Sequence, residues 1–473
     1  MTRKLVLFSA GGTIALVAIA VAVLIFVLDV NAYKPQLEAA ASRALGLQVH
    51  VDGAVGISIF PGVRITLGHV RIRNGTTDIA SVEKASLGMD LLPLLHREVR
   101  LRSITLQQPR IAIERNATGT LAFKAPQAAR DASPARNLET VSLRDATLVY
   151  TDRRSGGTFE ASHCRLDVKH LRLPAGAHPD VLSQMSFTAR LACKEARRNR
   201  FAVSNLQVSA NAAKGIINLD PITVRLFGAQ GSGRIRADLS GALPRYQIDY
   251  SLPQFRVEQF LETRVPQKVA EGPMDFSLEL SMQGETARSL RQSADGRIGL
   301  RGHDLTIDGT DLDAAFTRFE SSQEFDLLDA GAFFFAGPVG LVVTKGYNFA
   351  HLLQKSPGHS RIRKVVSEWK VRKGVAQAQD VAMATNKHRL ALRGKLDFVH
   401  EQFVDVTVAL IDAKGCVAVR QTIHGSFQKP EVEKPSVLNA LAGPVLKLLE
   451  QGRDLFPGGE CDVFYSGSVA PPR

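Results

Sequence analysis

The feature that most constrains this chain is a long succession of short stretches in which apolar and polar residues alternate. Apolar residues alternate with polar ones over residues 63–67, and again over residues 70–72 just before the pair Asn74-Gly75. A period of two that ends at Asn-Gly is typical of a β-strand entering a tight turn. The chain also has 38 Gly and 21 Pro but one Trp and six Tyr, which suits many strands joined by turns. A mainly β fold is therefore expected.

The same alternation predicts further strands along most of the chain. They are expected at residues 203–208, 216–226, 235–239, 246–252, 276–282, 381–383, 390–398 and 404–410. Strands that are apolar on one side must bury that side. A sandwich, a barrel, or a long curved sheet whose face is covered by something else would each achieve this.

One strand pattern occurs twice with little change. Residues 99–106 resemble residues 141–148, and in both the apolar phase shifts by one residue in the middle. Residues 300–307 form a looser third copy. A shift of one residue turns side chains to the other face of a sheet unless a bulge or turn absorbs it. We therefore expect a bulge or turn at Ser103 and at Asp145, within a repetitive sheet.

The N-terminal run over residues 5–28 contains no charged residue. A helix of about 20 apolar residues crosses the hydrocarbon core of a bilayer, and Arg3 and Lys4 before the run place the N-terminus in the cytoplasm. The alternative is a cleaved signal peptide, whose apolar core usually has only about 7–15 residues. We expect an uncleaved single-pass anchor with the remaining chain on the far side of the membrane.

Helical periodicity is confined to a few segments. It predicts a short helix over residues 31–45, a helix within residues 311–328 and an amphipathic helix over residues 437–456. An apolar run over residues 331–343 is too short to be a second membrane span. It is either a buried core segment or a segment that dips into a membrane surface. The membrane-proximal candidates are Phe333, Phe334, Phe335, Arg361, Arg363 and Lys364, because apolar residues beside cations suit an anionic headgroup boundary.

The chain has four cysteines, and it lacks both a C-x-x-C motif and a histidine cluster with zinc-like spacing. In an oxidising compartment an even number of cysteines favours disulfides. Their order suggests that Cys164 pairs with Cys193 and that Cys416 pairs with Cys461, each pair in a loop-rich region. Free buried thiols are the alternative.

No motif in the sequence indicates catalysis. A nucleophile elbow, a phosphate-binding loop with its Lys and a zinc-protease motif are all missing. Residues 228–233 are rich in Gly but are interpreted as an ordinary turn. Asp311 and Asp313 could bind a cation, but acidic residues are favoured at a helix N-terminus without one. No catalytic residue, metal or cofactor is predicted, and the chain is not expected to be an enzyme.

The formal net charge is +13, which attracts nucleic acid, anionic lipid headgroups or lipopolysaccharide phosphates. The positive charge is dispersed along the chain, and the predicted topology places the chain outside the cytoplasm. Nucleic acid is therefore not an expected partner.

Several segments resemble proteins of the AsmA family. The predicted anchor is followed by DVNAYKPQL at residues 29–37, LGLQV at residues 45–49 and GVRITLG at residues 62–68, in the order and spacing of that family. The last third resembles the family's C-terminal region at residues 375–381, 405–410 and 465–469. Residues 126–295 resemble the family only in their succession of predicted β-strands.

The resemblance implies a protein of diderm bacteria that is anchored in the inner membrane and lies mostly in the periplasm. The family is associated with outer-membrane biogenesis. It is similar to bridge-type lipid-transfer proteins, in which successive sheets form an apolar groove for acyl chains while headgroups stay in solvent. Candidates for the groove lining in this chain are Val99, Leu101, Ile111 and Ile113.

Together these observations predict a mainly β fold: a transmembrane helix, then an elongated, curved, repetitive antiparallel β-sheet that forms a groove, with a few helices in the C-terminal third. We expect an anchor at 1–28, an N-terminal β region at 29–125, a middle β region at 126–299 with an exposed loop near 126–137, and a C-terminal region at 300–473.

The expected function is to carry or shield phospholipid acyl chains between the inner and outer membranes. The alternative is a non-lipid assembly factor or scaffold for outer-membrane proteins. The expected partners are membrane lipids (phospholipid or lipopolysaccharide), the inner membrane and envelope assembly proteins. The chain is short for a bridge, so crossing the periplasm would require a partner or an oligomer.

Overall fold

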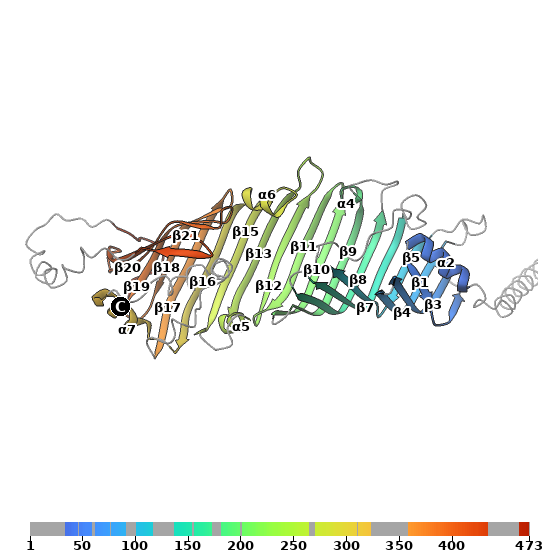
Figure 1. Cartoon of the computed structure of the whole chain (residues 1–473), viewed down its shortest axis with the longest axis horizontal. Coiled ribbons are helices and arrows are strands. Elements are labelled where there is room, and N and C mark those ends of the chain that lie inside the picture. The colour runs from blue at the N-terminus through green and yellow to red at the C-terminus, as the bar shows by residue number, and fades with distance from the viewer. Residues whose placement is uncertain are drawn as a thin grey trace, which may run out of the picture. The chain divides into compact units, whose positions relative to one another are not determined.

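The computed structural model describes residues 34–45, 47–58, 62–75, 77–90, 101–116, 137–153, 156–172, 181–198, 201–263, 270–309, 311–322, 358–433 and 463–472. They form two compact units, which are divided in the sequence between Gly215 and Ile216 (Figure 1). This division falls inside the expected middle region. None of the helices in the described residues is long and apolar enough to cross a membrane, and the predicted anchor lies outside those residues.

Unit 1 is built from strands with one helix at its start and one short helical turn. Its elements are α2 (Lys34–Leu45), β1 (Gln48–Val51), β2 (Val55–Ser58), β3 (Val63–Asn74), β4 (Thr77–Met89), β5 (Leu101–Gln107), β6 (Arg110–Arg115), β7 (Asn137–Asp152), β8 (Gly157–Arg172), α4 (Val181–Gln184), β9 (Ser186–Arg198) and β10 (Phe201–Ala213). The helix expected over residues 31–45 is present as α2. The hairpin expected at Asn74-Gly75 joins β3 to β4.

The sheet of unit 1 is mixed, whereas a fully antiparallel sheet was expected. β1 and β2 pair with β3, β3 pairs with β4, and β4 pairs with β5 and β6, all antiparallel. β5 and β6 then pair in parallel with β7. A parallel pair needs a connection of a dozen or more residues to return the chain to the same end. Residues 116–136 between β6 and β7 are long enough for this return.

The two similar segments found in the sequence lie on neighbouring strands, β5 and β7. The β4–β5 register shifts between Gly88 and Met89, which places the irregularity at Arg102, next to the expected Ser103. The β7–β8 register shifts on both sides of Ala146, and Asp145 has a φ of 55°. The phase shifts of the sequence pattern therefore correspond to β-bulges.

The described part of residues 161–199 is mostly strand, although the sequence suggested a less regular, loop-rich region. They belong mostly to β8 and β9, and β7 to β10 pair successively as antiparallel strands. His163 in β8 and Asn205 in β10 have φ values of 50° and 52°. Such residues interrupt the alternation of side chains along a strand, which explains why the pattern looked irregular.

Unit 2 continues the β architecture. Its elements are β11 (Ile216–Leu226), β12 (Ala229–Asp238), β13 (Arg245–Arg256), α5 (Val257–Glu262), β14 (Ala270–Glu271), β15 (Pro273–Gln283), α6 (Ala287–Gln292), β16 (Asp295–Asp308), α7 (Leu312–Ser322), β17 (His359–Arg372), β18 (Val375–Ala384), β19 (Arg389–Asp397), β20 (Gln402–Ile411), β21 (Val417–Ser426) and β22 (Lys429–Val432). The strands expected within these ranges are present.

The strands of unit 2 pair as antiparallel neighbours in the order β11, β12, β13, β15, β16, β17, β18, β19, β20, β21 and β22. The Gly-rich residues 228–233 are mostly strand, because the turn is at Phe227-Gly228 and β12 begins at Ala229. A Cβ at Gly231 or at Gly233 would collide with Tyr250 of β13. These two glycines therefore make room for an aromatic ring.

Helices were expected in the last third, but several short ones come earlier. α7 lies within the range expected to be helical, whereas α4, α5 and α6 precede residue 300 and have four, six and six residues. A helix of one or two turns is too short to produce a recognisable period. The other expected helix, at residues 437–456, and the apolar run at residues 331–343 lie outside the described residues.

A C-terminal segment covers one side of β17 to β20. Phe464, Tyr465 and Val469 pack against a row of small and apolar side chains on this side of the sheet, namely Val366, Ala382, Ala391 and Ala409. The hydroxyl of Tyr465 donates to Asp380, and Arg389 donates to the carbonyl of Val469 over 3.0 Å. Both sides of this part of the sheet are therefore buried.

Candidate functional site

Unit 1 has one apolar face that crosses neighbouring strands without interruption. Residues paired in register project to the same side of a sheet. Successive pairings across β3, β4, β5, β7, β8, β9 and β10 bring one apolar residue from each of these strands into a single row: Ile65, Leu87, Ile104, Val141, Val168, Ala189 and Ala210. Strands lie about 4.8 Å apart, so six spacings make this row about 29 Å wide.

The opposite face of the same strands is polar. The row one residue further along consists of Thr66, Ser86, Thr105, Ser142, Asp167, Arg190 and Ser209. Ser142 donates to Asp167 over 2.8 Å, and Arg144 forms an ion pair with Asp167 at 2.9 Å. The sheet therefore separates an apolar side from a polar side, on which Ser142 is only 4% exposed.

Unit 2 has the same division. Ile222, Gly233, Tyr250, Leu278, Ile298 and Trp369 form one row from β11 to β17. The opposite face carries Arg234, Asp249, Glu279, Arg297 and Lys370 in register. Ion pairs of 2.7 Å join Arg234 to Asp249 and Arg297 to Glu279 on this polar face.

The apolar face of unit 2 changes in exposure along the sheet. Ile222, Ile248, Leu278 and Leu280 are only half-buried. Beyond β16 the corresponding side chains are fully buried, as Val365, Met383 and Leu390 have 0% exposure. The face is therefore only half-buried over part of β11 to β16, where Leu252, Leu300 and Leu305 are nevertheless 4% exposed or less, and it is filled by the chain's own core at β17 to β20.

Helices occupy part of each apolar face. In unit 1, Leu37 and Ala41 of α2 pack against the cluster that contains Val49, Val51 and Val70. In unit 2, Leu261 of α5 and Phe316 of α7 are 2% and 0% exposed in the main core. Ile65 of the apolar row packs against the same cluster as α2, so the helix covers the beginning of this row.

The structure places the expected groove residues on the apolar face where it describes them. Leu101 is opposite Met89, Ile111 is opposite Leu148, and Ile113 is opposite Tyr150. All three expected residues are half-buried. Val99 lies outside the described residues.

Of the expected membrane-proximal residues, the structure describes the three cations, which all lie on β17. Arg361 forms an ion pair with Asp304 at 2.7 Å, and Lys364 donates to the carbonyl of Ser468 over 2.7 Å. Arg363 is exposed on β17. Phe333, Phe334 and Phe335 lie outside the described residues. Two of the three cations therefore serve contacts within unit 2.

Cys164 of β8 and Cys193 of β9 form a disulfide within the apolar face. Their neighbours there are Ala146, Ala161 and Ala196, all 5% exposed or less. Cys416 is also disulfide-bonded, and none of the described cysteines is free. Cys461 lies outside the described residues. The disulfide in unit 1 links neighbouring strands rather than loops.

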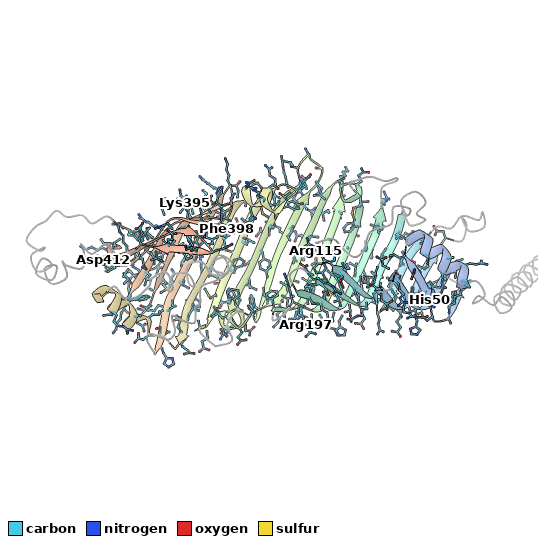
Figure 2. All side chains as sticks on the ribbon, viewed as in Figure 1. His50, Arg115, Arg197, Lys395, Phe398 and Asp412 are labelled. Atoms are coloured by element: carbon cyan, nitrogen blue, oxygen red, sulfur yellow. A yellow bond between two sulfur atoms is a disulfide. The ribbon has the colours of Figure 1, made fainter. Side chains whose placement is uncertain are left out.

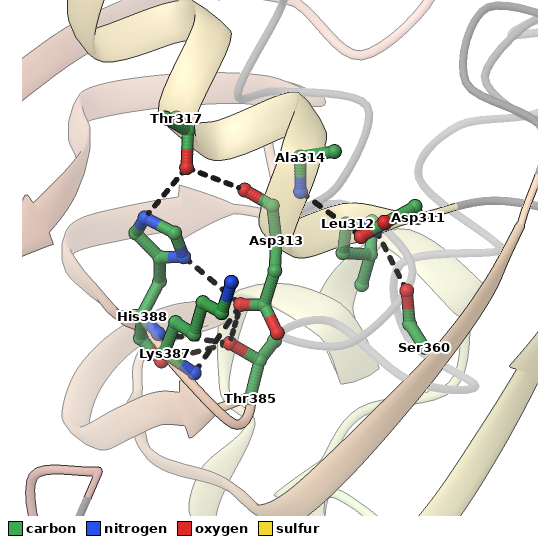
Figure 3. A network of polar contacts seen from close by, with 9 residues as sticks. All are labelled: Asp311, Leu312, Asp313, Ala314, Thr317, Ser360, Thr385, Lys387 and His388. Carbon is green, nitrogen blue, oxygen red and sulfur yellow. Dashed lines mark hydrogen bonds and ion pairs between the residues drawn. The ribbon is translucent and has the colours of Figure 1, made fainter.

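A network of polar contacts around Asp313 fastens α7 to the β18–β19 turn (Figure 3). The carboxylate of Asp313 accepts hydrogen bonds from the Thr385 hydroxyl and the Lys387 amide, and His388 Nδ1 lies 2.9 Å from it. Burial acts to raise the pKa of Asp313, but the bonds to His388 and Thr385 outweigh burial and hold this pKa below its ordinary value of 3.8. These contacts hold α7 against the β18–β19 turn, so their role is structural.

Asp311 caps the same helix, because its carboxylate accepts from the Ala314 amide over 2.9 Å. A cation is not needed to explain either aspartate. Among the described residues, no group of three or more His, Cys, Asp or Glu side chains could hold a metal ion.

A cavity of about 290 Å³ lies at the β12–β13 connection, lined by Asp238, Ser240, Gly241, Ala242, Leu243, Arg245 and Gln283. Ser240 donates to the Asp238 carboxylate through both its amide and its hydroxyl, at 3.1 and 2.6 Å. These bonds lower the pKa of Asp238. A carboxylate stabilised in its charged form is poorly suited to act as a general acid or base near neutral pH.

The sequence alone could not identify which side of the strands is apolar as a continuous surface. That property depends on register, and each register crosses bulges such as those at Asp145 and His163. Arg198 and Phe201, at the ends of β9 and β10, also belong to the apolar side. No sequence pattern singled out either residue.

A family model described as the AsmA family matches residues 1–202 and, in a second overlapping match, residues 158–323. Together the matches cover more than half of the chain. No curated protein matches it.

Proposed function

Because this chain belongs to the AsmA family, we propose that it serves the biogenesis of the bacterial envelope by carrying or shielding phospholipid acyl chains on the apolar faces of its sheets. The observation that supports this most strongly is the one-sided, half-buried apolar surface of each unit. A water-facing sheet normally covers such a surface with another layer. An acyl chain would supply this cover.

The energetics of such binding require no specific contact. Each buried CH₂ contributes about 0.8 kcal/mol, so an acyl chain lying along a row of Leu, Ile and Val side chains is held by its length. Weak and repeated contacts also let the chain slide from one row to the next. The polar face, with its ion pairs, remains solvated.

We propose that the protein is anchored in the inner membrane through residues 5–28 and lies mostly in the periplasm. The disulfide between Cys164 and Cys193 supports an oxidising compartment. We also propose that the protein is not an enzyme, because the described ionisable clusters serve structural contacts at α7 and at the β12–β13 connection.

The test compares matched substitutions on the two faces of one strand. Leu278 of β15 is half-buried on the apolar face, and its neighbour Glu279 is exposed on the polar face. In unit 1, Leu191 and Ala192 of β9 have the same relation. The measurement is crosslinking of the full-length chain, in membranes, to a phospholipid with a photoactivatable acyl chain.

Leu278→Lys and Leu191→Lys should lower the crosslinking yield several-fold, because a lysine on the apolar face interrupts the contact with the acyl chain. Glu279→Lys and Ala192→Lys should leave the yield near that of the unaltered chain. Fluorescence of the single Trp369 and circular dichroism check that each variant is folded. Equal yields in all four variants, or no crosslinking in a folded chain, would favour an assembly factor or scaffold instead.

A further inference from the structure

The apolar face of unit 1 ends in a row that contains a cation. Arg198 of β9 is opposite Phe159 of β8 on one side and opposite Phe201 of β10 on the other. Because paired residues project to the same side, Arg198 lies on the apolar face and not on the polar face.

The two aromatic neighbours of Arg198 differ in their surroundings. Phe159 packs against the buried cluster around Cys164 and Cys193. Phe201 is 39% exposed, which is unusual for a large apolar side chain among the described residues. The row therefore passes from a buried cluster to an exposed ring at the strand end, with Arg198 paired between the two phenylalanines.

The charge of Arg198 is unbalanced. Arg198 is exposed, and in the portion of unit 1 that the structure describes no carboxylate pairs with it. Its neighbour Arg197 is also exposed but lies on the polar face opposite Glu160, where its Nε is 3.9 Å from Glu195 Oε1 (Figure 2). Two adjacent arginines thus face different environments.

A cation beside an exposed aromatic ring matches the boundary between the phosphate and the acyl chains of a phospholipid. Guanidinium groups bind phosphate through paired hydrogen bonds, and aromatic rings favour the zone where acyl chains meet headgroups. The adjoining apolar rows provide the surface for the chains themselves.

We propose that this end of the apolar face binds the phosphate of a phospholipid headgroup through Arg198, with Phe159 and Phe201 against the first methylenes of the acyl chains. This inference rests on the proposed lipid-carrying function and adds a headgroup class to it. A lipid with a phosphate is favoured over an uncharged lipid with the same acyl chains.

The test uses two photoactivatable probes with identical acyl chains, phosphatidylglycerol and diacylglycerol, presented in detergent micelles to the full-length chain. Crosslinked peptides from β8 to β10 are quantified by mass spectrometry, and the readout is the phospholipid-to-diacylglycerol ratio. Arg198→Glu should lower this ratio about threefold, the size expected for an exposed ion pair. Arg198→Lys should keep part of the preference, and Arg197→Glu, with the same change of charge on the polar face, should leave the ratio unchanged.

A ratio that Arg198→Glu and Arg197→Glu alter equally would overturn the headgroup site, because the preference would then reflect overall charge. Phospholipid crosslinking that needs intact vesicles and disappears in micelles would also overturn it, in favour of docking on a membrane surface. If neither probe crosslinks to the apolar face, the lipid-carrying function itself fails. Equal crosslinking of both probes in the unaltered chain removes only the headgroup preference.

Discussion

At the scale of single residues, the described acidic groups of unit 2 are used to hold elements together. Asp313 connects α7 to the turn between β18 and β19, and its side chain is 16% exposed. Ser360 of β17 accepts the Leu312 amide over 2.6 Å, so the start of the helix is also held from the side of the sheet. The same helix carries Phe316 into the core.

Asp313→Asn should destabilise unit 2 at neutral pH by about 1.5–3 kcal/mol, the range for hydrogen bonds to a charged acceptor. The folded-state pKa of Asp313 lies below 3.8, so the carboxylate stabilises the fold fully above the unfolded pKa. That contribution is lost as the pH falls through the folded pKa. The difference in urea midpoint between the two chains, followed by Trp369 fluorescence, should therefore be large at pH 7 and shrink below about pH 4.

Asp311→Asn is the matched control for Asp313→Asn, because asparagine retains the acceptor that caps α7. It should shift the midpoint little at either pH. An equal loss for Asp313→Asn at pH 7 and at pH 3 would contradict the role given to the charge of Asp313.

At the scale of elements, the sequence predicted strands well where their alternation was unbroken. The alternation over Ile216–Leu226 coincides with β11, and Asn74-Gly75 marks the β3–β4 hairpin. Leu101, Ile111 and Ile113 also lie on the apolar face, while their role as a lining stays a prediction. These features depend only on local sequence, so the local pattern of apolar and polar residues is enough to predict them.

The features that local sequence did not predict depend on pairing or on very short segments. The parallel pairing of β5 and β6 with β7 follows from the return of the chain over residues 116–136, which carries no period. Positive φ values at His163 and Asn205 interrupt the alternation of apolar and polar side chains along β8 and β10. The environment of Arg198 appears only once its strand is paired on both sides.

α2 also protects an edge of the sheet in unit 1. Ser42 accepts the Val49 amide over 2.9 Å, and Glu38 accepts the Val51 amide over 2.6 Å, both from β1. An edge strand with free amides invites pairing with another chain. The helix therefore blocks this edge with side-chain acceptors.

Removing one acceptor should expose the edge. Glu38→Ala should speed hydrogen exchange of the Val51 amide about tenfold, which corresponds to about 1.4 kcal/mol for a hydrogen bond to a charged group. Glu83→Ala makes the same change of charge at an exposed position of β4 and serves as the control. Equal exchange in the two variants would mean that the Glu38 side chain does not protect β1.

At the scale of the whole molecule, a protein that holds lipid on open apolar faces must meet its lipid at a membrane. The predicted anchor at residues 5–28 would keep the chain there, because only five residues separate it from the described part, which begins at Lys34. Under the proposed function, the anchor would hold the one-sided sheets at the membrane, and the disulfide would form in the periplasm. The contribution of each part can be tested by a separate experiment.

Replacing residues 1–28 with a cleavable signal peptide should move the chain from the membrane fraction to the soluble periplasm, because the chain is still exported but has lost its anchor. The disulfide between Cys164 and Cys193 should still form, which a non-reducing peptide map can detect and which controls for export. In the unaltered chain, intact mass should include residues 1–28, and carbonate washing should leave the chain in the membrane. Loss of those residues from the mature chain would show that they are a signal peptide, and the membrane association of the protein would then have to come from its lipid-binding faces.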